Sequence, residues 1–353
     1  MAGEDDIPAA GTLDDRVRLY LNGYEMPIVE SYSLTRGILT QPATFSARLG
    51  WGGVIKELLA VLVPNAPFEL KINDASMFTG VLDDIDASGE TGATEITIYG
   101  RDSLAPLHDG FIEAEQDVSS LTYADLVKLG LDATIGTTYS IVYDNLANRK
   151  LTTGIGVTQT GAPPGDPQQK GGPTAKQLKL HIGERWYEAI KRHLDRVGLF
   201  LWADAEGNFV LSAPNSAQPA VYKILRRRGQ SRNAVSVISA HYKNHTSGRY
   251  TSADMFARSG KGKAGRNKIK GVAVDDEMTS YGFKRVMVLH DTNVTNPDQA
   301  DFYAKRKLAE SRRMGWALNY TVAGHTIPSL LDSGARATWC PDTVVAVEDE
   351  EFG

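Results

Sequence analysis

One glycine- and lysine-rich segment has the residue spacing of a known phosphate-binding motif. Residues 260 to 265 read G-x-G-x-x-G, the pattern in which a glycine turn and a helix N-terminus hold the pyrophosphate of a dinucleotide. That chemistry needs a strand before the first glycine and a helix after the last. Residues 252–259 read as polar and residues 266–270 as a basic loop, so we expect no phosphate site.

The same segment carries a run of positive charge. From Arg258 to Lys270 it holds six basic residues and no acidic one. One interpretation is a solvated, flexible loop. The other is a contact for an acidic partner surface or for passing nucleic acid, made through carboxylates or phosphates. The sequence leaves both open.

Two histidines have the spacing of metal ligands on a helix. His241 and His245 are four residues apart, but the sequence around them predicts a strand. At about 3.3 Å per residue a strand places them roughly 13 Å apart, too far to share one ion. We therefore expect no metal site there.

Three carboxylates, Asp83, Asp84 and Asp86, lie where a predicted strand ends before Gly89. Paired carboxylates catalyse acid–base steps when burial separates their pKa values, but polar turn residues are much commoner. No G-x-S-x-G, Walker or H-E-x-x-H motif is present. We assign no catalytic, cofactor-binding or metal-binding residue and predict that the chain is not an enzyme.

Two further features have structural interpretations. The triplet of arginines at 226–228 is predicted to form a solvated strand end that discourages strand addition. Cys340, next to Trp339, is predicted to be a small buried residue. As the single cysteine of the chain, it excludes an intrachain disulfide framework and a cysteine-rich metal site.

Charge and hydropathy narrow the classes of partner. The chain has 353 residues and a net charge of −5, enough length for two or more domains. The five acids of residues 1–15 account for this charge and the remainder balances, so the composition favours neither nucleic acid nor an anionic membrane as a general partner. No signal peptide and no apolar run of about 20 residues is present, so we expect a soluble chain without a membrane anchor.

The element that organises the rest is a helix followed by a hairpin. Trp186, Tyr187, Ile190 and Leu194 recur at helical spacing, and Gly198 suits a left-handed cap. Two apolar runs at 199–202 and 209–211 then flank a four-residue turn. This is a packing module without a catalytic arrangement.

Around this module the sequence predicts β-rich units. An Asn22-Gly23 turn joins strands at 17–21 and 24–34, and further strands follow at 44–49, 68–72, 77–84 and 95–99, with a helix at 54–62. A helix capped by Ser119 or Ser120 and a strand at 139–143 come next. Later strands are predicted at 221–225, 234–242, 283–289, 316–322 and 335–347, with a helix at 297–314.

These elements define the predicted domains. The fold class is β-rich α+β. A flexible acidic arm covers 1–15, a first β-barrel domain 16–110, an α/β insert with a long loop at 152–178 covers 111–220, and a second β-barrel domain with the helix 297–314 covers 221–353.

The order of these pieces resembles a known family. The stretch from Tyr99 to Leu107 is similar to the close of the first barrel in phage Mu-like baseplate hub proteins. The helix from Tyr187, the run 198–201 and the turn and strand at 204–211 resemble their helix-and-hairpin module, which the late-control protein D family and type VI secretion spike proteins share. The helix 297–314, Trp316 and the strand 341–348 resemble their second barrel.

The resemblance implies a function. In that family two related barrels in each of three chains form a ring, which matches a six-fold tail tube to a trimeric central spike. It implies a homotrimer in the virion tail baseplate, assembled in the host cytoplasm, with tube, spike and other baseplate proteins as partners and DNA passing through the lumen. Family members usually continue past the position that matches Gly353, so we expect either that the tail is trimmed in this chain or that a neighbouring chain supplies the missing strand pairing.

Two alternatives remain. The chain is a carbohydrate- or surface-binding β module of a tail, which would need exposed aromatic platforms, whereas its tryptophans mostly fall in apolar patterns. Or it is a tail-associated cell-wall hydrolase, which would need a carboxylate pair or a metal site.

Overall fold

The computed structural model describes residues 15–26, 29–50, 62–90, 93–136, 138–151, 178–215, 217–227, 237–259, 267–291, 294, 297–332 and 335–352. The helix predicted at 54–62 except Leu62, residues 1–14 of the acidic arm, the loop 152–178 except its last residue, and the motif at 260–265 lie outside the described residues.

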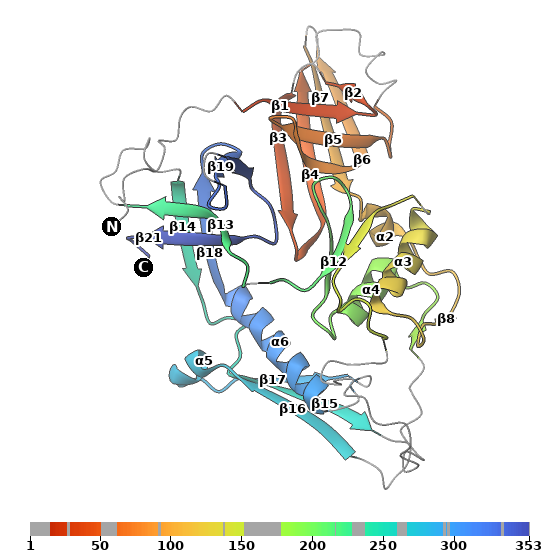
Figure 1. Ribbon diagram of the computed structural model, residues 1–353, viewed down its shortest axis with the longest axis vertical. Coiled ribbons are helices and arrows are strands. Elements are labelled where there is room, and N and C mark those ends of the chain that lie inside the picture. Colours follow the sequence, from red (N-terminus) through yellow and green to blue (C-terminus); the bar gives the residue numbers. More distant parts are fainter. Residues whose placement is uncertain are drawn as a thin grey trace.

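The N-terminal strands form one antiparallel sheet, called here the first sheet (Figure 1). Its order is β2-β1-β5-β6-β7-β4-β3. The predicted turn is confirmed: Asn22 and Gly23 have φ of 49° and 82° and join β1 to β2. The bounds are β1 Val17–Leu21, β2 Tyr24–Glu25, β3 Val29–Gly37, β4 Thr40–Gly50, β5 Pro67–Ile72, β6 Ala75–Glu90 and β7 Ala93–Asp102.

The first sheet curls around its own core. The rings of Phe45, Phe68 and Phe78 pack against one another with centroids 4.8–6.1 Å apart. The chain needs glycine beside these rings, since a Cβ on Gly100 would lie 2.5 Å from Cε1 of Phe68. Strand β3 also packs against β1, so the two ends of the sheet approach each other.

The insert forms a second core of helices and short strands. Its elements are α2 Ala105–Asp109, β8 Gln116–Asp117, α3 Tyr123–Thr134, β9 Ile141–Tyr143, β10 Lys179–Leu180, α4 Trp186–Leu194, β11 Phe200–Ala203 and β12 Phe209–Ser212. The helix-and-hairpin prediction is confirmed. Helix α4 buries Trp186, Tyr187, Ile190 and Leu194, Gly198 has φ of 77°, and β11 pairs with β12.

The predicted cap of α3 is wrong. Thr122 is the cap, and it forms a capping box with Asp125. The hydroxyl of Ser119 instead donates a hydrogen bond to the Asp117 carboxylate and accepts one from the Leu178 backbone N–H. It therefore helps to hold β8 and β10 together.

The C-terminal half contains two parts (Figure 1). In the first, helix α6 (Pro297–Gly315) covers a three-stranded sheet of order β16-β15-β17. Its strands are β15 Ser252–Ser259, β16 Asn267–Val274 and β17 Val286–His290, and α5 covers Asp276–Ser280. The expectation that the polar residues 252–259 form no strand is wrong: they form β15, in which Ala253, Met255 and Ala257 alternate toward the core.

The second part, called here the C-terminal unit, is made of strand pairs. Strand β13 pairs with β21 in parallel, β14 with β18 and β19 with β20 antiparallel. Its strands are β13 Ala220–Arg226, β14 Val237–Asn244, β18 Trp316–Val322, β19 Thr326–Pro328, β20 Arg336–Thr338 and β21 Val344–Asp349. The single strand predicted at 335–347 is therefore two, and the strand predicted at 283–289 begins later, at Val286.

The described residues form three hydrophobic cores: in the insert, in the first sheet, and between α6 and the three-stranded sheet. No residue of the C-terminal unit belongs to any of them, within the part of the chain that the structure describes. Its strand pairs form no closed sheet there, so a second barrel stays a prediction. No described helix is both long and apolar enough to span a membrane.

Candidate assembly interface

Helix α6 is the element that positions the C-terminal half. Ala300, Ala304 and Leu308 lie in the core against the three-stranded sheet. Backbones approach closely at Gly271 of β16, where a Cβ would lie 2.2 Å from the carbonyl carbon of Ala300. Because they pack this closely, helix α6 and strand β16 are held in a fixed position relative to each other.

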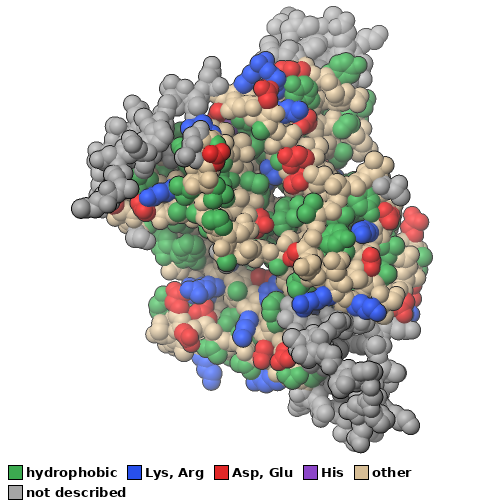
Figure 2. All heavy atoms as spheres, in the orientation of Figure 1, with side chains coloured by type: hydrophobic (Ala, Val, Ile, Leu, Met, Phe, Trp, Pro, Cys, Tyr) green, Lys and Arg blue, Asp and Glu red, His purple; other side chains and the backbone are tan. Residues whose placement is uncertain are grey.

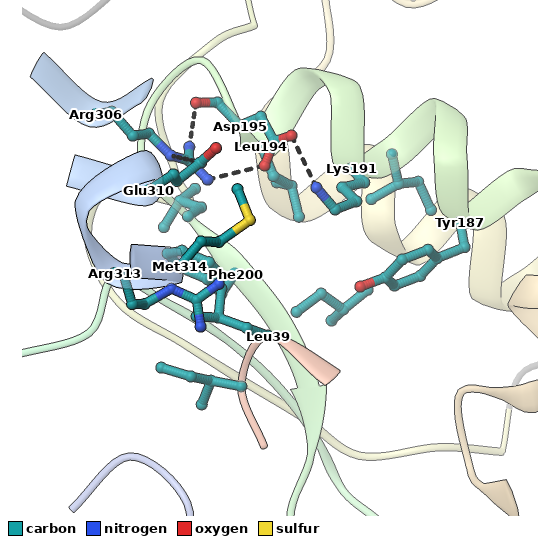
Figure 3. A pocket seen from close by; sticks show the side chains of 14 residues that line it. Leu39, Tyr187, Lys191, Leu194, Asp195, Phe200, Arg306, Glu310, Arg313 and Met314 are labelled. Carbon is teal, nitrogen blue, oxygen red and sulfur yellow. Dashed lines mark hydrogen bonds and ion pairs between the residues drawn. The ribbon is translucent and has the colours of Figure 1, made fainter. Parts of the chain in front are cut away.

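The other side of α6 is held by the insert (Figure 3). The Arg306 guanidinium lies 2.8 Å from the Asp195 carboxylate and also donates to the Asp195 carbonyl. It stacks over Phe200, 5.0 Å from the ring centroid. The crevice beside it, with Leu39 and Met314 on its rim, has a volume of about 160 Å³. Ligand pockets start at roughly 300 Å³, so this is a junction between units.

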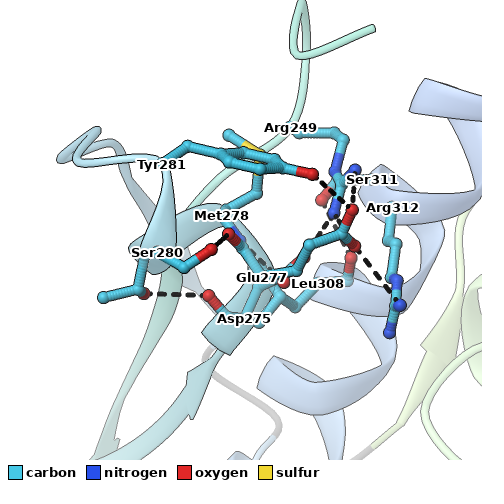
Figure 4. A network of polar contacts seen from close by, with 10 residues as sticks. Arg249, Asp275, Glu277, Met278, Ser280, Tyr281, Leu308, Ser311 and Arg312 are labelled. Carbon is cyan, nitrogen blue, oxygen red and sulfur yellow. Dashed lines mark hydrogen bonds and ion pairs between the residues drawn. The ribbon is translucent and has the colours of Figure 1, made fainter. Parts of the chain in front are cut away.

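A buried ionic network fixes α5 to the end of α6 (Figure 4). Nη2 of Arg249 lies 3.1 Å from Asp275 and 2.8 Å from Glu277. The Arg249 side chain is 1% exposed and lies against Gly315, where a Cβ would approach its Cδ to 2.5 Å. Arg312 adds a second cation 3.3 Å from Glu277. The pKa of Glu277 is lowered, first by its hydrogen bond from Arg249.

The outer face of the three-stranded sheet is apolar and exposed. The register places Val274, Ser252 and Val286 in one row, and Val272, Asp254 and Val288 in the next. The four valines at its edges are 42–69% exposed. The central Asp254 is paired with Lys270 at 3.0 Å, so the face carries little net charge. Exposed apolar side chains gathered on one face make this face a candidate interaction surface.

The C-terminal unit also leaves aromatic rings uncovered. Tyr242 lies 6.3 Å from Trp316 and 5.8 Å from Phe352, and all three are 41–47% exposed. Arg226 lies over Phe352. Aromatic and arginine side chains are enriched at the energetic centres of protein interfaces. Figure 2 shows hydrophobic side chains gathered over this unit and over the insert.

A groove of about 610 Å³ separates the first sheet from the C-terminal unit. Tyr32, Leu34 and Met77 line one side, and Trp339 and Pro341 the other. His325 also lines this groove, and its ring stacks on that of Tyr32 with the centroids 5.7 Å apart. Burial, then the nearby Asp15 charge, raises the pKa of Tyr32 to about 12.

Three solved structures share this arrangement of units. The tail protein from Neisseria meningitidis MC58 aligns with a TM-score of 0.73 and 21% identity, over 96% of this chain and 88% of that one. The 43 kDa tail protein of prophage MuSo2 from Shewanella oneidensis gives 0.67 and 20%, over 96% and 90%. Prophage tail protein gp18 from Listeria monocytogenes EGD-e gives 0.52 and 10%, over 87% and 80%.

The chain has the fold of phage tail proteins. This confirms, at the level of fold, the resemblance read from the sequence. The sequence matches no protein-family profile, and comparison with curated proteins finds no significant match. The likeness is therefore carried by the structure rather than by sequence identity.

The residues singled out for chemistry do not come together in this tail-protein fold. His241 lies on β14, while His245 follows it, with Nδ1 3.1 Å from the carbonyl oxygen of Ser247. No group of three or more His, Cys, Asp or Glu side chains with metal-binding geometry occurs among the described residues.

The carboxylates at 83–86 are not at a strand end, because β6 continues to Glu90. Asp83 accepts two hydrogen bonds from Arg101, at 2.6 and 2.7 Å, and Arg101 also binds Asp109. Asp84 accepts from the backbone of Ile85 at 2.8 Å. These are structural contacts along the rim of the first sheet.

Two other predictions need correction. Cys340 is exposed rather than buried, since it lies in the loop after β20, outside any core. Arg226 is not a free solvated edge residue, because it pairs with Asp349 and Glu351 at the end of β21. Arg228 lies outside the described residues.

The basic segment is partly strand. Its ends at 258–259 and 267–270 belong to the β15–β16 hairpin, so the interpretation as one flexible loop is wrong for them. Lys270 is paired with Asp254 and lies 5.4 Å from the Phe256 ring centroid. Residues 260–266 lie outside the described residues.

Sequence reasoning missed the residues that join elements far apart in the chain: Asp15, His325, Arg249 and Arg306. Their partners are far away along the chain, 310 residues in the case of Asp15 and His325. Their immediate neighbours in the chain are mostly charged, polar or glycine residues, so no local pattern marks these positions or identifies their partners.

Proposed function

We propose that this chain is a structural baseplate hub of a contractile phage tail or a related injection machine. In this role it joins the six-fold tail tube to the trimeric central spike by pseudo-six-fold symmetry matching. The observation that carries the proposal is the likeness in fold, over 96% of this chain, to the tail proteins from Neisseria meningitidis and Shewanella oneidensis.

The proposed assembly is a homotrimeric ring. The first sheet and the C-terminal unit are its two β units, related barrels in the assembled state, and three chains present six of them around an axis. The C-terminal unit supports this, because its described strands pair only as separate ribbons and such ribbons rarely stand alone in water. A neighbouring protomer would cover its aromatic residues or the valine face, as in obligate oligomers whose surface is buried only on assembly.

The partners follow from the ring. One face would meet the tail tube protein, the other the central spike, and the rim other baseplate proteins, with DNA passing through the lumen. The location is the virion tail baseplate, and assembly takes place in the host cytoplasm. Strands β15 and β16 lie at the periphery of the chain (Figure 1). The basic segment from Arg258 to Lys270 is the proposed contact for an acidic partner surface.

The test is the native mass of the purified chain, alone and with its tail tube protein. We expect a trimer, alone or on the tube. The double variant Val288→Asp and Trp316→Asp should lower the mass to that of one chain, while circular dichroism stays unchanged. The matched control is Ile182→Asp, because Ile182 is 65% exposed in the insert, away from both surfaces. A parent chain that stays monomeric in both settings would contradict the proposal.

The alternatives predict different results. A carbohydrate-binding module would be a monomer that binds glycan, and Trp316→Ala would abolish that binding. The exposed rings offer it little support, because Tyr242 and Trp316 meet at 76° rather than forming a flat platform. A cell-wall hydrolase would release soluble fragments from peptidoglycan, and this turnover would disappear on changing a single carboxylate.

A further inference from the structure

The last residue of the predicted acidic arm is fixed in the structure. The Asp15 side chain is 5% exposed. Its Oδ1 accepts a hydrogen bond of 2.7 Å from Nδ2 of Asn73, in the turn between β5 and β6. Asn73 is itself held by two hydrogen bonds with the Arg16 backbone, at 2.9 and 3.0 Å. Asp15 therefore belongs to the first sheet.

The other oxygen of the same carboxylate reaches the C-terminal unit. Oδ2 of Asp15 accepts from the His325 backbone N–H at 3.0 Å and lies 3.3 Å from His325 Nδ1. His325 sits between β18 and β19, directly after Gly324, which has φ of 76°. The Asp15 carboxylate therefore bridges the two units, because one of its oxygens accepts a hydrogen bond from the first sheet and the other accepts one from the C-terminal unit.

The surroundings favour an ionised bridge. Burial alone would raise the pKa of Asp15, but the hydrogen bonds from His325 and Asn73 outweigh it, and the pKa is lowered. The His325 ring also stacks on Tyr32 of β3, with an angle of 20° between the planes. The contact thus combines a charge-assisted hydrogen bond with ring packing, and His325 and Tyr32 both line the 610 Å³ groove.

We propose that the Asp15–His325 contact is a latch that sets the angle between the first sheet and the C-terminal unit. The inference rests on the proposed ring, in which six β units must be evenly spaced to face a six-fold tube. Half of the distances between neighbouring β units in this ring lie within a protomer, and the latch fixes these distances. Releasing it widens the groove and changes the spacing without unfolding either unit.

The test measures that angle directly in the full-length chain. Spin labels are placed on exposed positions of the two units, Ser88→Cys in β6 and Thr321→Cys in β18, in a Cys340→Ser background. Double electron–electron resonance then gives the distance distribution between them. With the latch intact we expect one narrow distribution.

Asp15→Asn is the decisive variant. An amide has one acceptor oxygen, so its NH₂ group must face a donor on either Asn73 or His325. We expect a broader distribution with a second, longer distance. His325→Ala keeps its backbone N–H but loses the ring, and should give an intermediate result. Asp74→Asn is the matched control, because it removes the same charge from the exposed neighbour of Asn73 and should change nothing.

The outcomes separate this inference from the proposed function. Parent-like distributions in both Asp15→Asn and His325→Ala, with unchanged circular dichroism, would overturn the latch. The native mass of the unlabelled parent is measured separately. A trimeric parent with an unresponsive angle leaves the hub proposal standing, and a monomeric parent with a responsive angle leaves a latch in a chain that is not a ring.

Discussion

The guanidinium of Arg249 lies 3.1 Å from the carboxylate of Asp275, and both side chains are almost fully buried. The same Asp275 caps α5 by accepting from the Met278 backbone. Arg249→Met should therefore leave a buried carboxylate without its cation. Removing one partner of a buried pair costs about 3–5 kcal/mol. We expect a loss near the lower end in the free energy of unfolding, measured by urea denaturation.

The control for this prediction is Arg312→Met. Arg312 contacts the same network at Glu277, but its side chain is 63% exposed. Exposed ion pairs contribute less than about 1 kcal/mol, so this variant should be near neutral. Equal losses in the two variants would show that burial of Arg249 does not set its contribution.

The close approach of β16 to α6 makes a second prediction. In Gly271→Ala the new methyl would meet backbone atoms of Ala300 and Asp301 at 2.2–2.4 Å, and backbone cannot move aside as a flexible side chain can. Overpacking of this kind costs about 1–3 kcal/mol. Gly37→Ala is the control, since its Cβ would lie an ordinary 3.5 Å from Thr40. Similar thermal midpoints for the two variants would contradict the prediction.

The sequence predicted the elements that local signals define. The helix-and-hairpin module, the Asn22-Gly23 turn and α6 all carry their periodicity and caps within a few residues. Strand β15 was missed because its buried residues are Ala253, Met255 and Ala257, two of them small. Their alternation with polar neighbours is a weak apolar signal.

The long-range contacts could not be predicted from the sequence for a different reason. Arg249 meets Glu277 across 28 residues and Arg306 meets Asp195 across 111. No periodic pattern links such positions, because tertiary packing alone brings them together. The same holds for the exposed valines of β16 and β17. In the sequence they belong to two ordinary strands, and only the pairing of both strands with β15 shows that they share one face.

Acid should destabilise the insert through His193. Burial, followed by the charges of Arg196 and Arg192, lowers the pKa of His193 to about 3. When the pH falls below 6.5, the ordinary pKa of histidine, His193 becomes protonated in the unfolded chain but stays neutral in the folded chain. The contribution of His193 is therefore complete above pH 6.5 and is lost as pH falls toward 3, by up to about 1.4 kcal/mol per pH unit.

The measurement is the free energy of unfolding of the parent and of His193→Gln at pH 7, 6 and 5. The difference between the two isolates His193, because other titrating groups stay in both chains. Asp102 is one of them and acts in the opposite direction, since burial raises its pKa to about 6. His181→Gln, at an exposed position, should follow the parent. A pH slope that His193→Gln leaves unchanged would refute the assignment.

The junction in Figure 3 gives the last prediction. Arg306 holds α6 to the insert through the carboxylate and carbonyl of Asp195 and through the ring of Phe200. Arg306→Ala should increase hydrogen exchange over residues 297–315 and cost about 1.5–3 kcal/mol, the range for hydrogen bonds to charged groups. Arg306→Lys should recover part of this, because an ammonium keeps the charge but loses the planar stacking. Lys305→Ala, on the exposed side of the same helix, should leave exchange unchanged. If hydrogen exchange over residues 297–315 is the same in Lys305→Ala and Arg306→Ala, then packing alone, and not the Arg306 contacts, holds α6 to the insert.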